Sequence, residues 1–390
     1  MHKHILHFLM YLCAGTTAFA FMAACQPNKQ GQAVDDGVAT DSTMIDTEHC
    51  QIKKIHVGPD ITHLPLCSQL IEMDGNEKYA MMDKGRIYIF DWEKGTLEDS
   101  VSTEKCGNLT NFSGFTIISA DSVLVYNNAD NTVFLINHAG DITAQYQRPA
   151  AENYTTTLAS VSALNHSRMQ WVGGRALLHG NLYGCMNRMP NMRVAISEWA
   201  DMNEGKGKVV AHYPALYGKK NWGGIYMNEF AVTTDTEGNT YYSFPISSKV
   251  LKYNADFTHC DTLLMKSRHD KGISPCKISP DKLEEDDSQD VRYYLSQPSY
   301  RHILFDTHRQ LLIRTAEVPR PQWNGREAFV KTFTFIVARP DGTVLSESPL
   351  FPYSHQWSTS NMHLCKEGIA IAVDNKDEEN IYFECFKINP

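Results

Sequence analysis

The sequence predicts an all-β protein, a β-propeller of six four-stranded blades, from three observations. Apolar residues occur in short alternating runs, many of them β-branched, rather than in the longer periodic runs of helices. Gly, Asn and Asp separate these runs, as they separate hairpin strands. The runs also fall into groups of four, and four hairpin-linked strands are the unit of a propeller blade. Because the groups are unevenly spaced, seven blades or two separate β domains remain alternatives.

The chain begins with a stretch typical of an export signal. Residues 5–24 are mostly apolar and carry no Asp, Glu, Lys or Arg, and small residues crowd the end of the stretch, as they do before a signal-peptidase cut. The tetrad Met22-Ala23-Ala24-Cys25 resembles the lipobox of bacterial lipoproteins, whose cysteine is acylated. We therefore expect a signal peptide over residues 1–24 and a lipid anchor on Cys25, since several acyl chains hold a protein stably on a membrane. An uncleaved membrane helix is the alternative.

The composition after the signal region indicates where the chain works and with what. Residues 25–48 are polar, rich in Asp and almost free of aromatic residues, which predicts a flexible tether. The propeller is expected over residues 49–390. Loss of Lys3 with the signal peptide moves the formal net charge from −9 to −10, and an acidic chain without a basic stripe is not expected to bind nucleic acid. The expected location is the cell envelope, at the outer membrane, facing either side.

The first two predicted blades lie before residue 150. Residues 69–101 contain four alternating runs, and residues 114–147 contain the clearest four in the chain. Short polar turns built from Asp, Asn, Ser and Gly separate the latter runs. The second blade is predicted from the strands Gly114–Ser119, Val123–Asn127, Thr132–Asn137 and Ile142–Gln147.

Three more groups of four follow, within residues 176–213, 229–265 and 301–347. The first of them includes a predicted strand at residues 182–186. The last group, within residues 362–387, has only three strands, and residues 51–58 near the other terminus can supply the fourth. Such an exchange closes the ring and covers strand edges that otherwise invite aggregation.

One helix is expected, inside an insertion over residues 266–299. Pro280 suits the first turn, and acidic residues crowd the start of Pro280–Ser296, as the helix dipole favours. The acidic residues 284–287 and Asp290 are expected to form a solvated face. They are not expected to bind calcium, which needs oxygen ligands at a structured spacing.

Three segments carry a resemblance to a known family. Residues 77–97 (EKYAMMDKGRIYIFDWEKGTL), residues 114–142 and residues 299–317 (SYRHILFDTHRQLLIRTAE) resemble the Bacteroidetes lipoproteins grouped as domain of unknown function 4221. The similarity extends over nearly the whole chain after the signal peptide and rests on hydrophobic pattern and turn residues. The resemblance implies an exported, propeller-like lipoprotein, and it brings no activity and no functional residue.

Four tryptophans are the most informative candidates for ligand contacts. They stand in segments with Gly, Pro and polar residues, which we interpret as loops or connections between blades. Flat aromatic faces beside Arg, Asn and His suit sugar rings or peptide side chains. Packing between blades is the alternative for each of them. The candidate ligand-binding residues are Trp171, Arg175, Trp222, Tyr226, Trp323, Arg326, His355 and Trp357.

No motif points to catalysis, a metal or a cofactor. The sequence contains no G-x-S-x-G, H-E-x-x-H, P-loop or G-x-G-x-x-G pattern. No metal site and no cofactor are therefore expected, and no catalytic residue can be assigned. His302 and Asp306, four residues apart on a predicted strand, are only a weak lead for acid–base chemistry. Arg301 and Arg314 are expected to form salt bridges between blades.

The sequence favours a non-enzymatic module that binds a glycan or a protein partner in the cell envelope. The alternative is a carbohydrate-active enzyme, a hydrolase or lyase, with its site at one mouth of the propeller. Glycoside cleavage needs two carboxylates about 5 to 10 Å apart, and we expect them beside an aromatic platform. A purely structural envelope subunit would instead expose an apolar patch.

Overall fold

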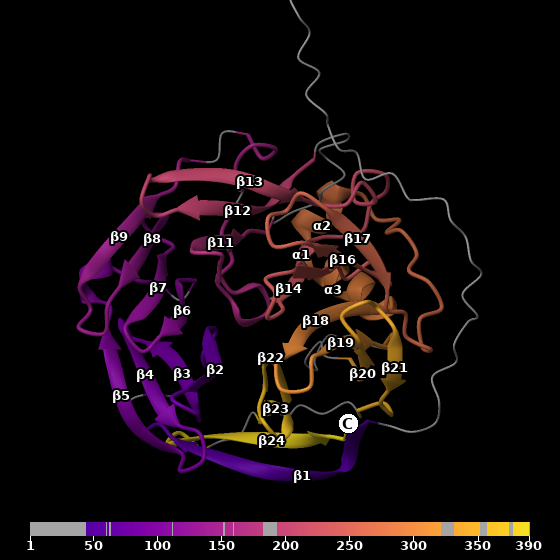
Figure 1. The fold of residues 1–390 in the computed structure, drawn as a ribbon. Helices are drawn as coiled ribbons and strands as arrows, with labels where there is room; N and C mark the ends of the chain where they lie inside the picture. Colours follow the sequence, from indigo (N-terminus) through magenta and orange to yellow (C-terminus); the bar gives the residue numbers. More distant parts are fainter. Residues whose placement is uncertain are drawn as a thin grey trace, which may run out of the picture. The chain divides into compact units, whose positions relative to one another are not determined.

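The computed structural model describes residues 44–389, with the exception of residues 60, 62–63, 111, 151–152, 159, 182–192, 321–330, 352–356 and 374–376. The side chain of Glu284 is also outside the description. Within them, twenty-four strands form six separate four-stranded sheets, and every pair of neighbouring strands is antiparallel. The sheets are arranged around a ring as propeller blades (Figure 1). The predicted fold class and the predicted six blades are confirmed.

Each blade runs from an inner to an outer strand (Figure 1). Blade 1 contains β2 (Ser68–Met73), β3 (Asn76–Asp83), β4 (Arg86–Asp91) and β5 (Thr96–Ser102). Blade 2 contains β6 (Gly114–Ser119), β7 (Ser122–Asn127), β8 (Thr132–Ile136) and β9 (Ile142–Gln147). Blade 3 contains β10 (Gln170–Val172), β11 (Arg175–His179), β12 (Ala195–Asp201) and β13 (Lys206–His212).

The remaining blades follow the same order. Blade 4 contains β14 (Ala231–Thr234), β15 (Thr240–Ser243), β16 (Lys249–Tyr253) and β17 (Cys260–Leu264). Blade 5 contains β18 (Ser299–Asp306), β19 (Leu311–Glu317), β20 (Phe333–Ala338) and β21 (Val344–Glu347). Blade 6 contains β22 (Trp357–Leu364), β23 (Gly368–Val373), β24 (Asn380–Ile388) and, outermost, β1 (Ile45–His56).

The ring is closed by the exchange of the N-terminal strand. β1 pairs antiparallel with β24, from Ile45 opposite Ile388 to His56 opposite Asn380. The strand therefore begins inside residues 25–48, which the sequence analysis predicted to be tether. Ile45 is only 1% exposed and packs in one cluster with Phe386 and Ile388, so burial of this apolar side chain extends the folded part toward the N-terminus.

Blade 3 differs from its prediction. Its inner strand is Gln170–Val172, in a segment for which the sequence predicts a loop or a connection between blades. The predicted strand at residues 182–186 lies outside the described residues. Three residues are too few to show an alternating pattern. The tight turn that follows uses Gly173 and Gly174, both with positive φ (57° and 79°).

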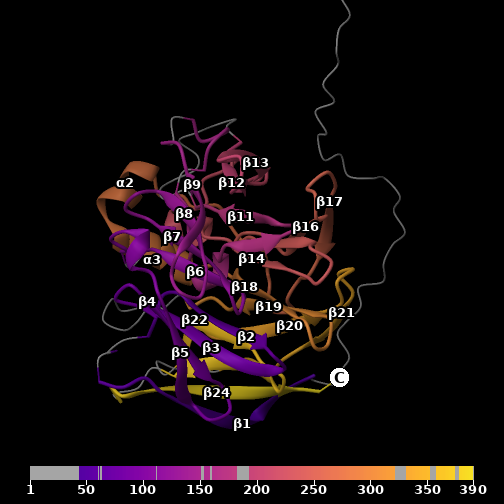
Figure 2. The ribbon, with the colours of Figure 1, turned by 60° about the vertical axis from the view of Figure 1, so that its left-hand side comes forward.

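The predicted helix is two helices. α2 (Pro280–Glu285) and α3 (Asp287–Ser296) are separated by Asp286, whose backbone is extended, and the Asp286 side chain accepts a hydrogen bond from the Ser288 N–H. An N-cap of this kind starts a new helix. Both helices lie on one side of the ring (Figure 2), and the short helix α1 (Ile225–Asn228) contacts α3. None of the described helices has the length and apolar character needed to span a membrane.

The expectation of a solvated acidic face is wrong for Asp290. This residue is 5% exposed, and its Oδ1 accepts a 2.7 Å hydrogen bond from the Gly224 N–H. The contact joins α3 to the start of α1. Burial raises the pKa of Asp290, against the opposing effect of this hydrogen bond.

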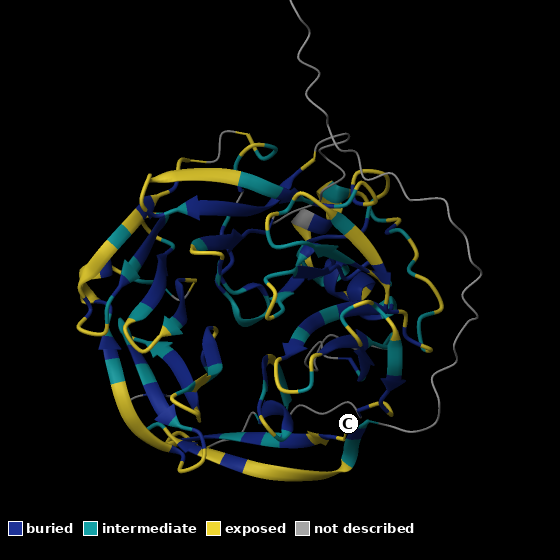
Figure 3. Cartoon of the chain, viewed as in Figure 1, coloured by how far each residue is buried: buried dark blue, intermediate teal, exposed yellow. Residues whose placement is uncertain are grey.

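The apolar core lies between neighbouring blades. One cluster, for example, joins Ile87 and Val101 of blade 1 to Phe115, Val125 and other residues of blade 2. Figure 3 shows buried residues on the inner strands and exposed residues along the outermost strands β5 and β9. The inner strands are thereby held at fixed positions, and their ends and turns are what the fold can offer to a ligand.

Candidate functional site

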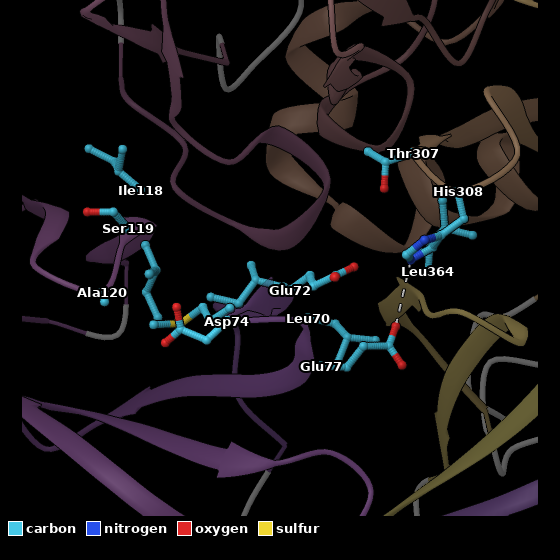
Figure 4. Close-up of a pocket in the computed structure, with 13 residues that line it drawn as sticks. Leu70, Glu72, Asp74, Glu77, Ile118, Ser119, Ala120, Thr307, His308 and Leu364 are labelled. Atoms are coloured by element: carbon cyan, nitrogen blue, oxygen red, sulfur yellow. Dashed lines mark ion pairs between the residues drawn. The ribbon is translucent and has the colours of Figure 1, made fainter.

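A pocket of about 510 Å³ lies where the inner strands of four blades end. We call it the inner-turn pocket. β2 and β3 of blade 1 and the end of β6 supply most of its wall, and the β18–β19 turn and the end of β22 complete it (Figure 4). Its lining residues are Leu70, Ile71, Glu72, Met73, Asp74, Glu77, Ile117, Ile118, Ser119, Ala120, Thr307, His308 and Leu364.

Two tight turns fix the polar side chains of this pocket. Met73 pairs with Asn76 across a two-residue turn, and Asp74 and Gly75 both have positive φ (50° and 77°), which is the Asp-Gly chemistry of a type I′ hairpin. In the β18–β19 turn, Asp306 Oδ1 accepts hydrogen bonds from the His308 and Arg309 N–H groups at 2.9 and 3.1 Å. The turns therefore hold Asp74 and His308 at defined places on the rim.

The pocket carries an excess of negative charge. Glu72, Asp74 and Glu77 line it, and His308 is its only basic lining residue among those described. His308 Nε2 lies 3.9 Å from Glu77 Oε1, the contact drawn as a dashed line in Figure 4. Glu72 Oε1 lies 3.7 Å from Lys366 Nζ, where both side chains are nearly half exposed.

Glu77 is the buried member of this set. It is 7% exposed and its Oε1 accepts a 2.7 Å hydrogen bond from the Lys366 N–H. Burial raises the pKa of Glu77, and the nearby Glu367 carboxylate adds to the rise. Within the described residues, Asp74 takes part in no ion pair. Its carboxylate can therefore meet a cation from solution.

Most of the remaining lining is aliphatic, and no Phe, Tyr or Trp occurs among the described lining residues. Pockets that hold small ligands combine apolar walls with a few aimed polar groups. This pocket suits a ligand with an apolar body and a polar or positively charged end. Its apolar lining residues are Leu70, Ile71, Met73, Ile117, Ile118, Ala120 and Leu364.

A group of three carboxylates lies behind the pocket. Ligand oxygens of Glu77, Glu93 and Glu367 lie within 4.8 Å of one another, the one such group in the described part of the chain. Lys53 Nζ, on a side chain that is 8% exposed, sits 2.7 Å from Glu93 Oε2. The Lys53 ammonium is therefore a cation that already pairs with this group of carboxylates.

A second polar region lies among the starts of the inner strands. There the 3₁₀ turn Asn165–Ser167 packs against blades 4 and 6. Asn165 Oδ1 accepts the Ser68 N–H at 2.7 Å, and its Nδ2 donates to Ser360 O at 2.9 Å. Arg168 donates to the Ser68 carbonyl. We call this region the axial network, made of Ser68, Asn165, His166, Arg168, Glu229, Arg301, His302 and Asn361.

Charges in the axial network are mostly paired. Glu229 Oε1 lies 3.3 Å from His166 Nε2, and Glu229 Oε2 lies 3.0 Å from Arg301 Nη2. The three side chains are 11 to 21% exposed. Burial by itself would raise the pKa of Glu229, but His166 and Arg301 outweigh it and hold that pKa well below its usual range. Burial and the same two neighbours lower the pKa of His302 to about 3.

The inter-blade salt bridge predicted for Arg301 is confirmed, because Glu229 precedes β14 of blade 4 while Arg301 belongs to blade 5. The one predicted for Arg314 is wrong. Arg314 is fully buried and donates to Ser243 Oγ and to the carbonyls of Ser247, Ser248 and Met265. Its guanidinium also lies 3.9 Å from the centre of the Tyr300 ring. Carbonyl oxygens of blade 4 replace the expected acid, and burial lowers the pKa of Arg314 to about 10.

Three of the four tryptophans predicted to contact a ligand are described, and they lie in three different hydrophobic clusters. Trp171 stands on β10 and Trp357 on β22, so neither is in a loop as predicted. Trp222 is 7% exposed and donates from Nε1 to Leu216 O at 3.0 Å. Trp357 donates from Nε1 to Glu384 Oε2 at 2.7 Å. The structure thus places the three in the packing of the blades.

The other predicted residues are also dispersed. The Arg175 guanidinium lies 4.4 Å from the centre of the Trp199 ring, and Tyr226 on α1 stacks against Tyr294 with ring centres 5.4 Å apart. Cys25, Trp323, Arg326 and His355 lie outside the described residues. None of the described candidates lines the inner-turn pocket.

The acid–base lead at His302 and Asp306 is not supported. Asp306 bonds within its own turn and to Arg309, while the His302 ring faces the His166 ring at 6.3 Å. Sequence reasoning missed Glu72, Asp74, Glu77 and His308. The hairpin at Asp74-Gly75 was predictable, but its convergence with the β18–β19 turn depends on how the ring closes.

Comparison with known proteins gives a family and a fold. The family model described as "Domain of unknown function (DUF4221)" matches residues 47–348. The crystal structure of a member of that family from Bacteroides vulgatus is 20% identical, covering 86% of this chain and 96% of that chain, with a TM-score of 0.72. A protein from Bacteroides fragilis, named as a candidate exported protein, is 10% identical, covering 90% and 98%, with a TM-score of 0.54. Both likenesses concern the fold alone. No curated protein matches this chain.

Proposed function

The chain belongs to the DUF4221 family, and we propose that it is an exported, lipid-anchored protein of the cell envelope that binds a ligand in the inner-turn pocket without converting it. The pocket is the observation that carries this proposal. Its volume of about 510 Å³ lies within the range of small-ligand sites, and its aliphatic wall with a few carboxylates has the composition of such sites.

The anchoring part of the proposal rests on the leader sequence. The tetrad at residues 22–25 has the form of a lipobox and follows an apolar stretch with small residues at its end. The structural neighbour from Bacteroides fragilis is named as an exported protein, which agrees with export of this chain. We place the lipid on Cys25 and the protein at the outer membrane.

A carbohydrate-active enzyme is the second candidate, because Glu72, Asp74 and Glu77 offer more than one carboxylate. The aromatic platform that this candidate calls for is missing from the described lining residues. The same observation lowers the support for a glycan as the bound partner. Binding of another ligand, without chemistry, fits the pocket better.

The test is a ligand screen on the purified mature lipoprotein in detergent micelles, read by thermal unfolding and including a glycan panel. Thr307 is exposed and lines the pocket, so Thr307→Trp should fill the site without disturbing the core. The matched control is Thr236→Trp, an exposed position in the inner turn of blade 4 outside the pocket.

Ligands of the pocket should raise the melting temperature of the wild type and of Thr236→Trp but not of Thr307→Trp. Hits that stabilise all three proteins equally would contradict the proposal. Product released from a glycan hit would establish the enzyme instead.

A further inference from the structure

We infer that the ligand of the inner-turn pocket carries an aliphatic primary ammonium group, as an alkylamine or a lysine side chain does. The inference rests on the proposed function, since it names the ligand class for the same site. Three carboxylates and one histidine are the titratable groups that line this pocket within the described residues.

Charge complementarity is the first argument. Within the described residues, Glu72 has only Lys366 as a cationic neighbour, at 3.7 Å and nearly half exposed, and exposed pairs of this kind are weak. Asp74 is in no ion pair among the described residues. In Figure 4, Glu72 reaches from β2 toward the side formed by Thr307 and His308, while Asp74 lies on the side of Ser119 and Ala120. A cation that enters the pocket would meet Glu72, which has one weak partner, and Asp74, which has no ion-pair partner among the described residues.

The surroundings strengthen the negative potential. Glu77 is buried at the wall of the pocket, and behind it oxygens of Glu93 and Glu367 lie within 4.8 Å of it and of each other. Lys53 is the buried cation beside this group, paired with Glu93 at 2.7 Å. Fields of like sign add within a low-dielectric wall and raise the local concentration of the opposite charge. An anionic ligand would be repelled by the same groups.

The shape of the cation is the second argument. A guanidinium is planar and prefers a carboxylate that faces it with two oxygens, whereas an ammonium is compact and has three donors without a fixed plane. Glu72 comes from β2, Asp74 from the turn that follows it and Glu77 from β3. Carboxylates that come from three backbone positions can each give one oxygen to the three donors of an ammonium.

The wall of the pocket specifies an aliphatic chain. Leu70, Met73, Ile118 and Leu364 line it, and each methylene that a ligand buries against such side chains strengthens binding about fourfold. The absence of an aromatic residue from the described lining argues against quaternary ammonium ions, which are recognised by aromatic cages.

The experiment is calorimetric titration of the mature lipoprotein with three probes of equal chain length, namely hexylammonium, hexanol and hexanoate. The variants are Glu72→Gln, Asp74→Asn and the two combined. Asn-Gly suits a type I′ turn as well as Asp-Gly does, so Asp74→Asn keeps the hairpin. The matched control is Glu237→Gln, an exposed acid in the inner turn of blade 4 that does not line the pocket.

Hexylammonium should bind at least about tenfold more tightly than hexanol or hexanoate, the effect of one charge-assisted contact. The combined variant should lose this preference and Glu237→Gln should keep it. A titration with N-acetyl-lysine methylamide distinguishes a lysine side chain from a free alkylamine as the natural ligand. If this probe binds as tightly as hexylammonium, the ligand is a lysine side chain. If it binds more than about tenfold more weakly, the ligand is a free amine.

Two results overturn the inference while leaving the proposed function standing. In the first, hexanol or hexanoate binds as tightly as hexylammonium, and the Thr307→Trp variant no longer binds it. The other is a preference for hexylammonium that survives in the combined variant. If no probe binds and the ligand screen yields nothing sensitive to Thr307→Trp, both the inference and the proposed function fail.

Discussion

The two polar regions near the axis of the ring use similar residues in opposite ways. In the axial network, Glu229 is enclosed and forms ion pairs with His166 at 3.3 Å and with Arg301 at 3.0 Å. In the inner-turn pocket, Glu72 has one half-exposed lysine at 3.7 Å, and Asp74 takes part in no ion pair within the described residues.

Burial explains the difference. A charge removed from water is tolerated only with a partner, so the charged groups of the enclosed region pair with one another across neighbouring blades. The carboxylates of the open region remain accessible to a ligand from solution. Substitutions in the two regions should therefore differ first in stability and only then in binding.

The largest effect is expected for Glu229→Gln. Removing this carboxylate leaves Arg301 and His166 without their acid in an enclosed site, which should lower the free energy of unfolding by about 3 kcal/mol. Urea denaturation at pH 7 measures the loss. The matched control is Glu72→Gln in the pocket, and equal losses for the two variants would contradict the comparison.

The next effect concerns acid. The pKa of His302 is lowered to about 3 in the folded chain, chiefly by burial, from a reference of 6.5. The unfolded chain therefore binds more protons between these values, and the stability present above pH 6.5 is lost as the pH falls toward 3. At pH 5 this one histidine should cost about 2 kcal/mol relative to pH 7. His179 and His363, whose pKa values are also lowered to about 3 by burial, should act in the same direction.

Urea denaturation across pH 5 to 7 tests this, with His302→Gln as the variant. The variant should lose less stability between pH 7 and pH 5 than the wild type does. If the variant and the wild type lose the same stability between pH 7 and pH 5, His302 is not the group that causes the loss.

A smaller effect is expected for Asn165→Ala. The substitution leaves the Ser68 N–H without its acceptor at 2.7 Å and removes the hydrogen bond that Asn165 donates to the Ser360 carbonyl. An unsatisfied group in a partly buried site should cost about 1.5 kcal/mol. Chemical denaturation is the measurement, and Asn76→Ala, an exposed amide in the pocket's hairpin, is the control that should change little.

The smallest effect on stability is expected for Glu72→Gln combined with Asp74→Asn. Exposed carboxylates, even with one exposed lysine nearby, contribute little to folding, so the free energy of unfolding should stay within about 0.5 kcal/mol of the wild type. A loss above about 1 kcal/mol would mean that these acids serve the fold and would remove the contrast with Glu229.

Much of the fold could be predicted because its signals are local. The strands Gly114–Ser119 and Ile142–Gln147 have the predicted bounds, since alternation and turn residues act within a few positions. The short strand β10 and the break at Asp286 were missed. Three residues cannot display a period, and an Asp inside an acidic helical run does not reveal that its side chain caps the next helix.

The candidate site was far less predictable. Trp171, Trp222 and Trp357 have the composition of ligand contacts in the sequence, yet they pack into three separate clusters. A large aromatic side chain serves packing and binding equally well, and only its neighbours decide between them. The residues that line the pocket carry no motif, because they come from four blades.

The sequence by itself determined the strands, the turns, the exchange of the N-terminal strand and the expectation of a lipid on Cys25, because each of these depends on neighbouring residues or on one pattern of side chains. Only the tertiary structure decided that Glu77 meets His308 of the β18–β19 turn, and that Glu229 is paired while Asp74 has no ion pair among the described residues. Closure of the ring brings together segments that are hundreds of residues apart, and the burial that results sets the energy of each charge.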